Sequence, residues 1–214
     1  MKLKLATRVL NEEYFINTFL EYYINLGVDE IHIFDCSSYD NTLNIISAWQ
    51  SKHKGIILAL SDKRFRHTSY INASNFCNYI LEYAINNQIQ SDEDSWWIFA
   101  DIDEFIRAPN DKNLKKFLKE CHNDLIRTVF IDWQLPPDLI NQNLELNYIL
   151  RNVRLGSYKG YIQKLYGDPF YKDYIINFTP HNIKTYEKLK TIAGFHRFIL
   201  KNQIFLPPNE FLIV

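Results

Sequence analysis

The sequence has few cysteines, almost no net charge and no long apolar run, and each shortage excludes a class of protein. Its cysteines, Cys36, Cys77 and Cys121, are odd in number, widely spaced and free of any Cys-x-x-Cys pair. This pattern argues against a disulfide framework or a zinc site and for a reducing compartment. The formal net charge is −1, so bulk charge predicts neither nucleic acid nor an anionic membrane as a partner.

No apolar run approaches the length of a membrane-spanning helix. The first residues, Met1–Ala6, begin with a basic side chain but lack the sustained apolar core of a signal peptide. We therefore expect a cytoplasmic protein, with peripheral contact to the inner membrane left open. The 214 residues are enough for one domain with a substantial core and too few for two ordinary domains.

The most informative stretch is Trp96–Phe105. Its first five residues are all apolar or aromatic, and three carboxylates, Asp101, Asp103 and Glu104, then follow within four positions. A continuous apolar run of this kind predicts a strand that is buried on both faces, as in a mostly parallel sheet. The carboxylates then lie where the strand leaves the core, which is the edge at which open α/β sheets bind ligands.

Asp101 and Asp103 are separated by one residue, so at a strand end they share a side. Two hard oxygen ligands at one point suit Mg²⁺ or Mn²⁺ that is held jointly with the phosphates of a substrate. An Asp-x-Asp pair alone is a weak signal, because most copies are solvated turns. The buried strand before it favours a functional site, since carboxylates near a core are costly unless a positive charge compensates them.

Strand and helix patterns alternate through the first half of the chain, which predicts βαβ units and an α/β fold with a mostly parallel sheet flanked by helices. Asn11 is the expected N-cap of the first helix, Phe15, Phe19, Tyr22 and Leu26 its buried face, and Gly27 its end. Leu43, Ile46 and Trp49 are the expected inward face of the second helix. The expected strands are Lys2–Leu10, Glu30–Phe34, Ile56–Leu60 and the Trp96 strand, with a third helix at Tyr70–Asn86.

Three of these strands in a row end in aspartate, at Asp35, Asp62 and Asp101. Beyond them we expect a short helix at Leu114–Cys121 and a strand at Thr128–Trp133. Two further strands are expected at Tyr161–Tyr166 and Tyr174–Phe178.

Four segments together resemble glycosyltransferases of the GT-A fold, specifically the family 2-like group. They are Arg8–Glu12, Gly27–Asp35 with Ser38–Thr42, the Asp-x-Asp-Glu-Phe motif of Trp97–Phe105, and Pro180–Asn182. The resemblance covers the first half well and the second half thinly. Gln134–Pro137 departs from the small residues that relatives tend to carry after this strand.

The resemblance implies a GT-A, Rossmann-like sandwich, with residues 1–214 as one domain. Residues 1–108 would bind the nucleotide sugar and residues 109–214 would form the acceptor side. The implied reaction moves a sugar from a nucleotide-diphosphate donor, usually uridine-linked, to a hydroxyl of a glycan or lipid-linked acceptor. Synthesis of a bacterial surface polysaccharide or lipooligosaccharide is the expected setting, and a homo-oligomer is left open.

The resemblance also assigns roles to residues. Mn²⁺ or Mg²⁺ would be held by Asp101, Asp103 and His181, with His196 as the alternative to His181. The donor would contact Arg8, Asn11, Glu12, Asp35, Asp62 and Asp101, with Lys63, Arg64 or Arg66 either on the phosphates or merely solvated. Asp132 is the first candidate for the base of an inverting mechanism, ahead of Asp138 and Glu145.

Several of these residues have a structural alternative. Asp35 and Asp40 could cap the helix that begins near Thr42, and for Asp40 this interpretation is favoured. Glu104 could stabilise the motif through hydrogen bonds without touching the metal.

Two other functions compete with sugar transfer. A sugar nucleotidyltransferase would be expected to carry a glycine-rich, basic loop after the first strand, whereas Leu10–Glu13 is acidic. A non-catalytic carbohydrate- or nucleotide-binding module would use the aromatic side chains between Tyr161 and Tyr174 for stacking, although core packing is the favoured role for these rings.

Overall fold

The structure is a computed structural model. It describes residues 1–61, 70–91, 93–108, 113–122, 124–129, 131–133, 156–158, 171–186, 188–192, 197–200, 203–204 and 211–213. In chain order its elements are β1 (Lys2–Val9), α1 (Ile16–Asn25), β2 (Glu30–Asp35), α2 (Thr42–Lys52), β3 (Ile57–Ser61), α3 (Tyr70–Ile89), β4 (Ser95–Phe99), α4 (Leu114–Glu120), β5 (Leu125–Val129), β6 (Ile131–Trp133), β7 (Gly156–Tyr158), β8 (Tyr171–Phe178), α7 (Ile183–Tyr186), β9 (Lys190–Ile192), β10 (Arg197–Leu200), β11 (Gln203–Ile204) and β12 (Phe211–Ile213). None of the helices in this described part is both long enough and apolar enough to cross a bilayer.

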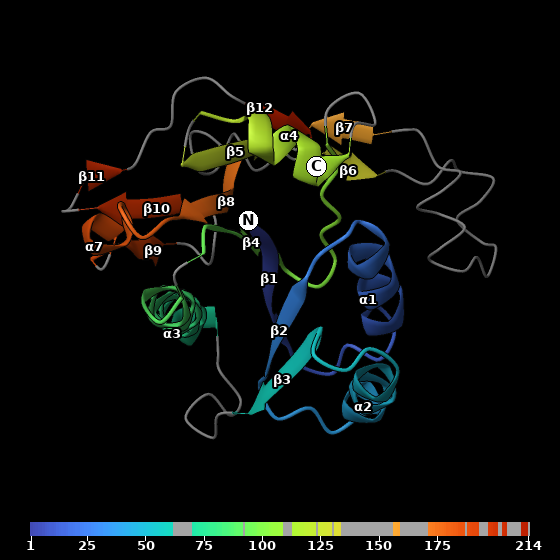
Figure 1. Cartoon of the computed structure of the whole chain (residues 1–214). Helices are drawn as coiled ribbons and strands as arrows, with labels where there is room; N and C mark the ends of the chain where they lie inside the picture. Colours follow the sequence, from blue (N-terminus) through green and yellow to red (C-terminus); the bar gives the residue numbers. More distant parts are fainter. Residues whose placement is uncertain are drawn as a thin grey trace.

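A seven-stranded sheet in the order β12-β5-β8-β4-β1-β2-β3 forms the centre of the molecule (Figure 1). β1 pairs in parallel with β2 and β4, and β2 pairs in parallel with β3. β8 runs antiparallel to both β4 and β5. The carboxyl ends of β1, β2, β3 and β4 therefore meet at one edge of the sheet, which confirms the predicted mostly parallel α/β architecture.

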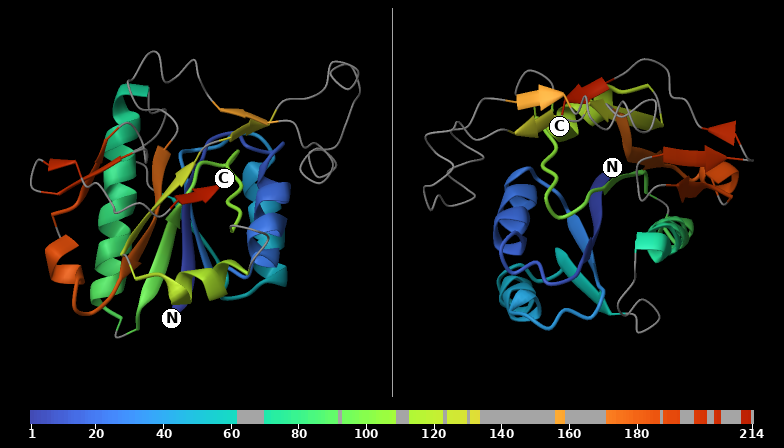
Figure 2. Two further views of the ribbon diagram at one scale, coloured as in Figure 1. Left: turned by 90° about the horizontal axis from the view of Figure 1, so that it is seen from above. Right: turned by 180° about the vertical axis from the view of Figure 1, so that it is seen from behind.

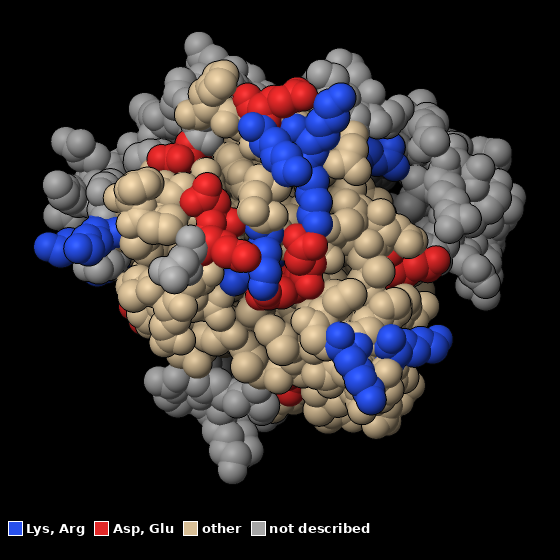
Figure 3. Space-filling model, in the orientation of Figure 1, with Lys and Arg blue, Asp and Glu red and all other residues tan. Residues whose placement is uncertain are grey.

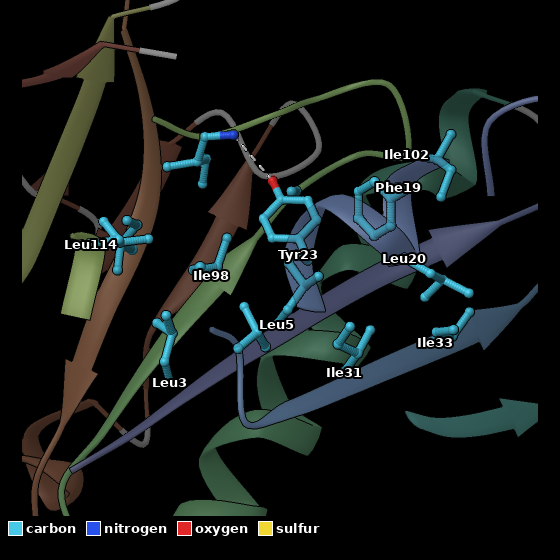
Figure 4. Packing of buried hydrophobic residues seen from close by; sticks show 14 of the residues in the cluster. Leu3, Leu5, Phe19, Leu20, Tyr23, Ile31, Ile33, Ile98, Ile102 and Leu114 are labelled. Carbon is cyan, nitrogen blue, oxygen red and sulfur yellow. Dashed lines mark hydrogen bonds between the residues drawn. The ribbon is translucent and has the colours of Figure 1, made fainter. Parts of the chain in front are cut away.

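Helices cover both faces of this sheet (Figure 2). α1 and α2 lie on one face and α3 lies on the other (Figure 1). On the first face, Phe19 and Leu20 of α1 pack over Leu5 of β1, Ile31 of β2 and Ile98 of β4 in one buried cluster (Figure 4).

A second buried cluster on the α3 face contains Phe76 and Ile80 of α3 with Trp97 and Phe99 of β4. Side chains on both faces of β4 are thus fully buried. This confirms the prediction that the strand has no solvated face, and explains why its sequence shows no alternation.

The first helix differs from its prediction. α1 begins at Ile16, with Phe15 at the N-cap position and no side-chain cap. Asn11 has a φ of 58°, whereas an N-cap residue has a β-region φ, so the predicted cap at Asn11 is wrong. The end of the helix is confirmed, because Gly27 follows it with a φ of 91° that favours glycine.

The predicted inward faces are confirmed in part, because Phe19 of α1 is fully buried and Trp49 of α2 packs against the same core. The fully buried residues of α1 include Leu20 and Tyr23, whereas Phe15, Tyr22 and Leu26 are only partly buried. In α2, Ile46 is buried as predicted, but Leu43 is 43% exposed.

In the second half, α4 confirms the predicted short helix, and β8 contains the predicted strand Tyr174–Phe178. The predicted strand Thr128–Trp133 divides instead between β5 of the central sheet and β6, which pairs with β7 in a separate two-stranded sheet. Tyr161–Tyr166 lies outside the described residues.

Charged side chains of both signs lie next to each other on the face of the molecule shown in Figure 3. At the amino edge of the sheet, Glu30 contacts Lys2 Nζ at 2.9 Å, Lys4 Nζ at 3.4 Å and His32 Nε2 at 3.3 Å. The hydrogen bond to His32, with help from Lys2 and Lys4, lowers the pKa of Glu30 to about 2 against the opposing effect of burial. Glu30 is therefore paired with cations at this edge.

Candidate functional site

A cavity of about 470 Å³ opens at the other edge of the sheet, where β1 and β4 end. It is formed by the end of β1 with the loop after it, the residue after β2, and the turn after β4. Its lining residues are Arg8, Val9, Leu10, Glu12, Phe15, Cys36, Asp101, Ile102 and Asp103. Three carboxylates and one guanidinium thus face a pocket with an otherwise largely apolar wall.

The turn of residues 101–104 positions two of these carboxylates. The Glu104 N–H donates to the Asp101 carbonyl at 3.0 Å, and the Asp101 N–H donates to Glu104 Oε2 at 2.8 Å. Glu104 is 5% exposed and Ile102 is 7% exposed. The turn therefore buries Ile102 and Glu104 while Asp101 and Asp103 line the cavity, and Glu104 stabilises the turn through hydrogen bonds as one interpretation of the sequence proposed.

Arg8 provides positive charge to the same pocket. Its Nε lies 3.3 Å from Asp101 Oδ1, and both side chains are partly buried. The guanidinium balances one carboxylate, which leaves the negative charges of Asp103 and Glu12 facing the cavity.

Glu12 shows the electrostatic result of this arrangement. Burial, followed by the negative charges of Asp103, Asp40 and Asp101, raises the pKa of Glu12 to about 7 against the opposing effect of Arg8. Like charges around one pocket favour a proton or another cation between them. The pKa of Glu12 is therefore shifted in the opposite direction to that of Glu30 at the amino edge, which the hydrogen bond to His32, with Lys2 and Lys4, lowers.

The donor set fits a hard divalent cation. Among the described residues, no group of three or more His, Cys, Asp or Glu side chains is arranged to hold a metal ion. Mg²⁺-type sites do not need such a cage, because they use one or two carboxylates together with waters and substrate phosphates. Asp101 and Asp103 supply that number of carboxylates, and burial, followed by the surrounding negative charges, raises the pKa of Glu12 in the same cavity.

Two loops beside the cavity are joined by several hydrogen bonds. The Asn11 N–H donates to Ser38 Oγ at 3.0 Å, and Asn11 Oδ1 accepts from the Tyr39 N–H at 2.9 Å. The Glu12 N–H donates to Thr42 Oγ1 at 2.7 Å. Loop residues 11–13 and 37–42 thereby form one unit, the two-loop contact, which fixes the backbone of Glu12 at the pocket.

Two predicted functional residues shape these loops. Both carboxylate oxygens of Asp35 accept backbone N–H groups, from Ser37 at 3.0 Å and Ser38 at 3.1 Å. Asp40 accepts from the N–H of Thr42, the first residue of α2, at 3.0 Å, whereas the N-cap position of this helix is Asn41, whose side chain makes no capping bond. Asp35 does not line the cavity, although it lies beside Val9 in the sheet register.

A sequence profile of glycosyltransferase family 92 matches residues 8–134, which is more than half of the chain. The chain belongs to glycosyltransferase family 92. The match begins at Arg8 and includes the Asp101–Glu104 turn. It confirms the predicted class of enzyme at the level of the family, with family 92 in place of the family 2-like group that the motifs suggested. None of the curated protein sequences matches the chain significantly.

Solved structures support the fold. The chain is similar to S. aureus TarS 1-349 at a TM-score of 0.52 and 17% identity, covering 100% of this chain and 58% of that one. The same TarS fragment in complex with UDP matches with a TM-score of 0.51, 17% identity and the same coverage of 100% and 58%. This likeness confirms the GT-A fold class, and the family 92 chain spans only 58% of the length of the TarS fragment.

A third similar structure is the mannosyltransferase PcManGT from Pyrobaculum calidifontis in complex with GDP-Man and Mn²⁺. Its TM-score is 0.44 at 14% identity, covering 100% of this chain and 56% of that one.

The structure separates His181 from the carboxylates. Because β8 is antiparallel to β4, Phe178 at its end pairs with Ser95 at the start of β4. His181 follows three residues later and is exposed, so it lies at the amino edge of the sheet while Asp101 and Asp103 lie at the carboxyl edge. The structure does not bring His181 to the pocket.

Other predicted site residues lie where their side chains are not described. Asp132 is the middle residue of β6 and pairs with Ser157 of β7, outside the central sheet. Outside the described residues lie Asp62, Lys63, Arg64, Arg66, Asp138, Glu145 and His196.

Some residues of the family 92 pocket were not anticipated from the sequence. Leu10, Phe15 and Cys36 line the cavity, and burial raises the pKa of the Cys36 thiol to about 11, so it is not a nucleophile at neutral pH. In the sequence, Leu10 and Cys36 are distinguished only by following directly after a strand.

Asn11→Ala is expected to destabilise the protein more than Asn11→Gly, by about 1 kcal/mol, because only glycine adopts a φ of 58° without strain. Both variants also lose the hydrogen bond to the Tyr39 N–H, a further cost of about 1 kcal/mol. Urea unfolding of the two variants measures the difference. Equal losses in both variants would show that the left-handed backbone of Asn11 is not what stabilises the two-loop contact.

Proposed function

We propose that this family 92 chain transfers a sugar from a nucleotide-diphosphate donor to an acceptor hydroxyl, with Asp101 and Asp103 holding Mn²⁺ or Mg²⁺. The observation that carries the proposal is the convergence of Glu12, Asp101 and Asp103 on one cavity at the carboxyl edge of the sheet. Open α/β sheets bind their ligands at this edge. The cavity volume of about 470 Å³ is within the range of small-molecule sites.

The bound cation would neutralise the diphosphate and make it a better leaving group. Arg8 places its guanidinium at the same pocket, where it would donate hydrogen bonds to phosphate oxygens as readily as to the carboxylate of Asp101. Val9, Leu10 and Phe15 give the cavity an apolar wall, which strengthens these charge interactions by excluding water.

Uridine is the proposed nucleotide, supported by the similarity of the fold to TarS, which is solved with UDP. Arg8 and Glu12 line the cavity and are proposed to contact the donor. Asn11 and Asp35 stand beside it and, with Asp62, are proposed to shape or contact the nucleotide side. Asp132 stays the proposed base. The proposed acceptor is a glycan or a lipid-linked molecule, and the proposed setting is the synthesis of a bacterial surface polysaccharide or lipooligosaccharide.

A thermal-shift experiment tests the donor and the cation together. We expect UDP with Mn²⁺ to raise the melting temperature by roughly 5–10 °C at a ligand concentration 100 times Kd, which corresponds to about 2.7 kcal/mol. GDP with Mn²⁺, UDP with EDTA, and Mn²⁺ alone are expected to give smaller shifts. Equal shifts with all nucleotides, or no shift with any, would remove the support for a uridine-linked donor.

Donor hydrolysis separates a catalyst from a binding module. A glycosyltransferase is expected to release UDP slowly from its own donor in the presence of Mn²⁺, and to stop when EDTA is added. Binding without release, across a panel of uridine-linked sugars, would favour the non-catalytic module.

A further inference from the structure

The hydroxyl of Tyr23 contacts the backbone just after the carboxylate turn. Tyr23 belongs to α1 and is completely buried. Its hydroxyl donates to the Glu104 carbonyl at 2.9 Å and accepts from the Ile106 N–H at 3.4 Å. Figure 4 shows Tyr23 in the buried cluster, with a hydrogen bond of its hydroxyl drawn as a dashed line.

The neighbouring Tyr22 contacts the same segment. Its hydroxyl donates to the Ile106 carbonyl at 2.6 Å. Two consecutive side chains of one helix therefore bond three backbone groups of the Glu104–Ile106 stretch. Burial, followed by the neighbouring Tyr22, raises the pKa of Tyr23 well above its ordinary value, so its hydroxyl stays protonated and remains a donor.

The bonded stretch has no regular structure of its own. β4 ends at Phe99, and the next element, α4, begins only at Leu114. The directions of Asp101 and Asp103 therefore depend on contacts of the turn with the rest of the chain. A short path of bonds leads from the Tyr23 hydroxyl to the Glu104 backbone, and from Glu104 Oε2 to the Asp101 N–H.

We propose that Tyr23 is a positioning residue for the cation, because its hydroxyl fixes the turn from which Asp101 and Asp103 present their oxygens. The inference rests on the proposed cation site at these two carboxylates. Core packing alone does not need this hydroxyl, since a phenyl ring fills the same space. A buried hydroxyl with two backbone hydrogen-bond partners instead holds the backbone after the turn in one conformation.

Tyr23→Phe is the direct test, because it deletes one oxygen and keeps the ring. Groups that orient metal ligands typically change metal affinity by about 10- to 100-fold when they are mutated. We expect Tyr23→Phe to raise the Kd for Mn²⁺, measured by electron paramagnetic resonance on the full chain with UDP present, by about that factor. Donor hydrolysis at saturating Mn²⁺ is expected to recover toward the wild-type rate, because the ligands themselves are intact.

Tyr83→Phe is the matched control. Its hydroxyl lies 3.1 Å from His32 Nδ1, and it belongs to α3 on the opposite face of the sheet. We expect its Mn²⁺ affinity to stay within about two-fold of wild type, since it has no contact with the turn. A purely structural role for Tyr23 would lower the melting temperature and leave the Kd for Mn²⁺ unchanged, and that result would overturn the proposal.

A second variant covers the case in which Tyr23→Phe does not fold. Tyr22→Phe removes the bond to the Ile106 carbonyl, together with a hydrogen bond to the Arg107 side chain, from a side chain that is not fully buried. We expect roughly a 10-fold weaker Mn²⁺ affinity, and an unchanged affinity in this variant would overturn the proposal. If the wild-type protein binds no Mn²⁺ even with UDP, the proposed cation site is wrong. If it binds Mn²⁺ but Tyr23→Phe binds it equally well, only the positioning role of Tyr23 is wrong.

Discussion

Asp103→Ala is expected to lower the rate of metal-dependent donor hydrolysis by about 1,000-fold, which corresponds to about 4 kcal/mol of lost transition-state stabilisation. Asp103 is exposed to the cavity and has a negative charge that raises the pKa of Glu12. Its carboxylate is therefore available to a cation, and Glu104 cannot replace it, because Glu104 is buried and bonded to the backbone of Asp101. Initial rates of UDP release at several Mn²⁺ concentrations measure the effect.

The comparison of Asp103 with two other aspartates makes this prediction specific. Asp94→Asn is the matched control, because Asp94 is exposed at the amino edge of the sheet just before β4. It is expected to leave the rate unchanged. Asp101→Ala is expected to lose activity and also stability, since it leaves the partly buried guanidinium of Arg8 without its 3.3 Å partner. A similar rate in Asp103→Ala and Asp94→Asn would contradict the cation site.

Local patterns predicted the part of the site that depends on one strand. The unbroken apolar run before Asp101 required burial on both faces, and burial on both faces required a sheet covered by helices. Given parallel strands, the carboxyl ends of β1 and β4 had to meet, which brings Arg8 and Asp101 together. The register that pairs Ala6 with Phe99 confirms this reasoning.

The sequence could not predict features that depend on distant partners. Asn11 reads locally as a helix cap, but hydrogen bonds to Ser38 and Tyr39 hold it in a left-handed conformation. The family resemblance of Pro180–Asn182 predicted His181 as a metal ligand, yet the antiparallel direction of β8 carries it to the far edge of the sheet. The sequence does not distinguish Tyr23 from other aromatic residues of the core, because no local pattern shows where its hydroxyl points.

Glu12→Gln is expected to stabilise the metal-free protein at pH 8 while weakening its binding of the cation. The pKa of Glu12 is about 7 in the folded protein, above its ordinary value of 4.5. The folded state therefore keeps a proton that the unfolded chain loses between pH 4.5 and pH 7, and the free energy of unfolding falls as the pH rises through this window. Above pH 7 the ionised Glu12 costs about 1–2 kcal/mol, a figure reduced for its partial exposure to solvent.

Glutamine removes this cost because it has no charge to bury and none to repel Asp103, Asp40 and Asp101. Urea unfolding should therefore show the variant about 1–2 kcal/mol more stable than wild type at pH 8 and equal to it at pH 4. Glu82→Gln, an exposed change on α3, is the control and is expected to alter neither value. A variant that gains nothing at pH 8, or gains as much at pH 4, would show that Glu12 is not under electrostatic strain.

Adding Mn²⁺ and UDP should make the wild-type protein more stable than Glu12→Gln at pH 8, the reverse of the order without ligands. The cation supplies the positive charge that the pocket lacks, so the repulsion around Glu12 becomes attraction and the wild-type protein gains more stability on binding than Glu12→Gln. Thermal melts at pH 8 with and without Mn²⁺ and UDP measure this exchange. A pocket that is destabilising when empty and stabilising when loaded is expected of a binding site, where function opposes stability. If Glu12→Gln remains the more stable protein in the presence of both ligands, the carboxylates around this cavity serve something other than a cation.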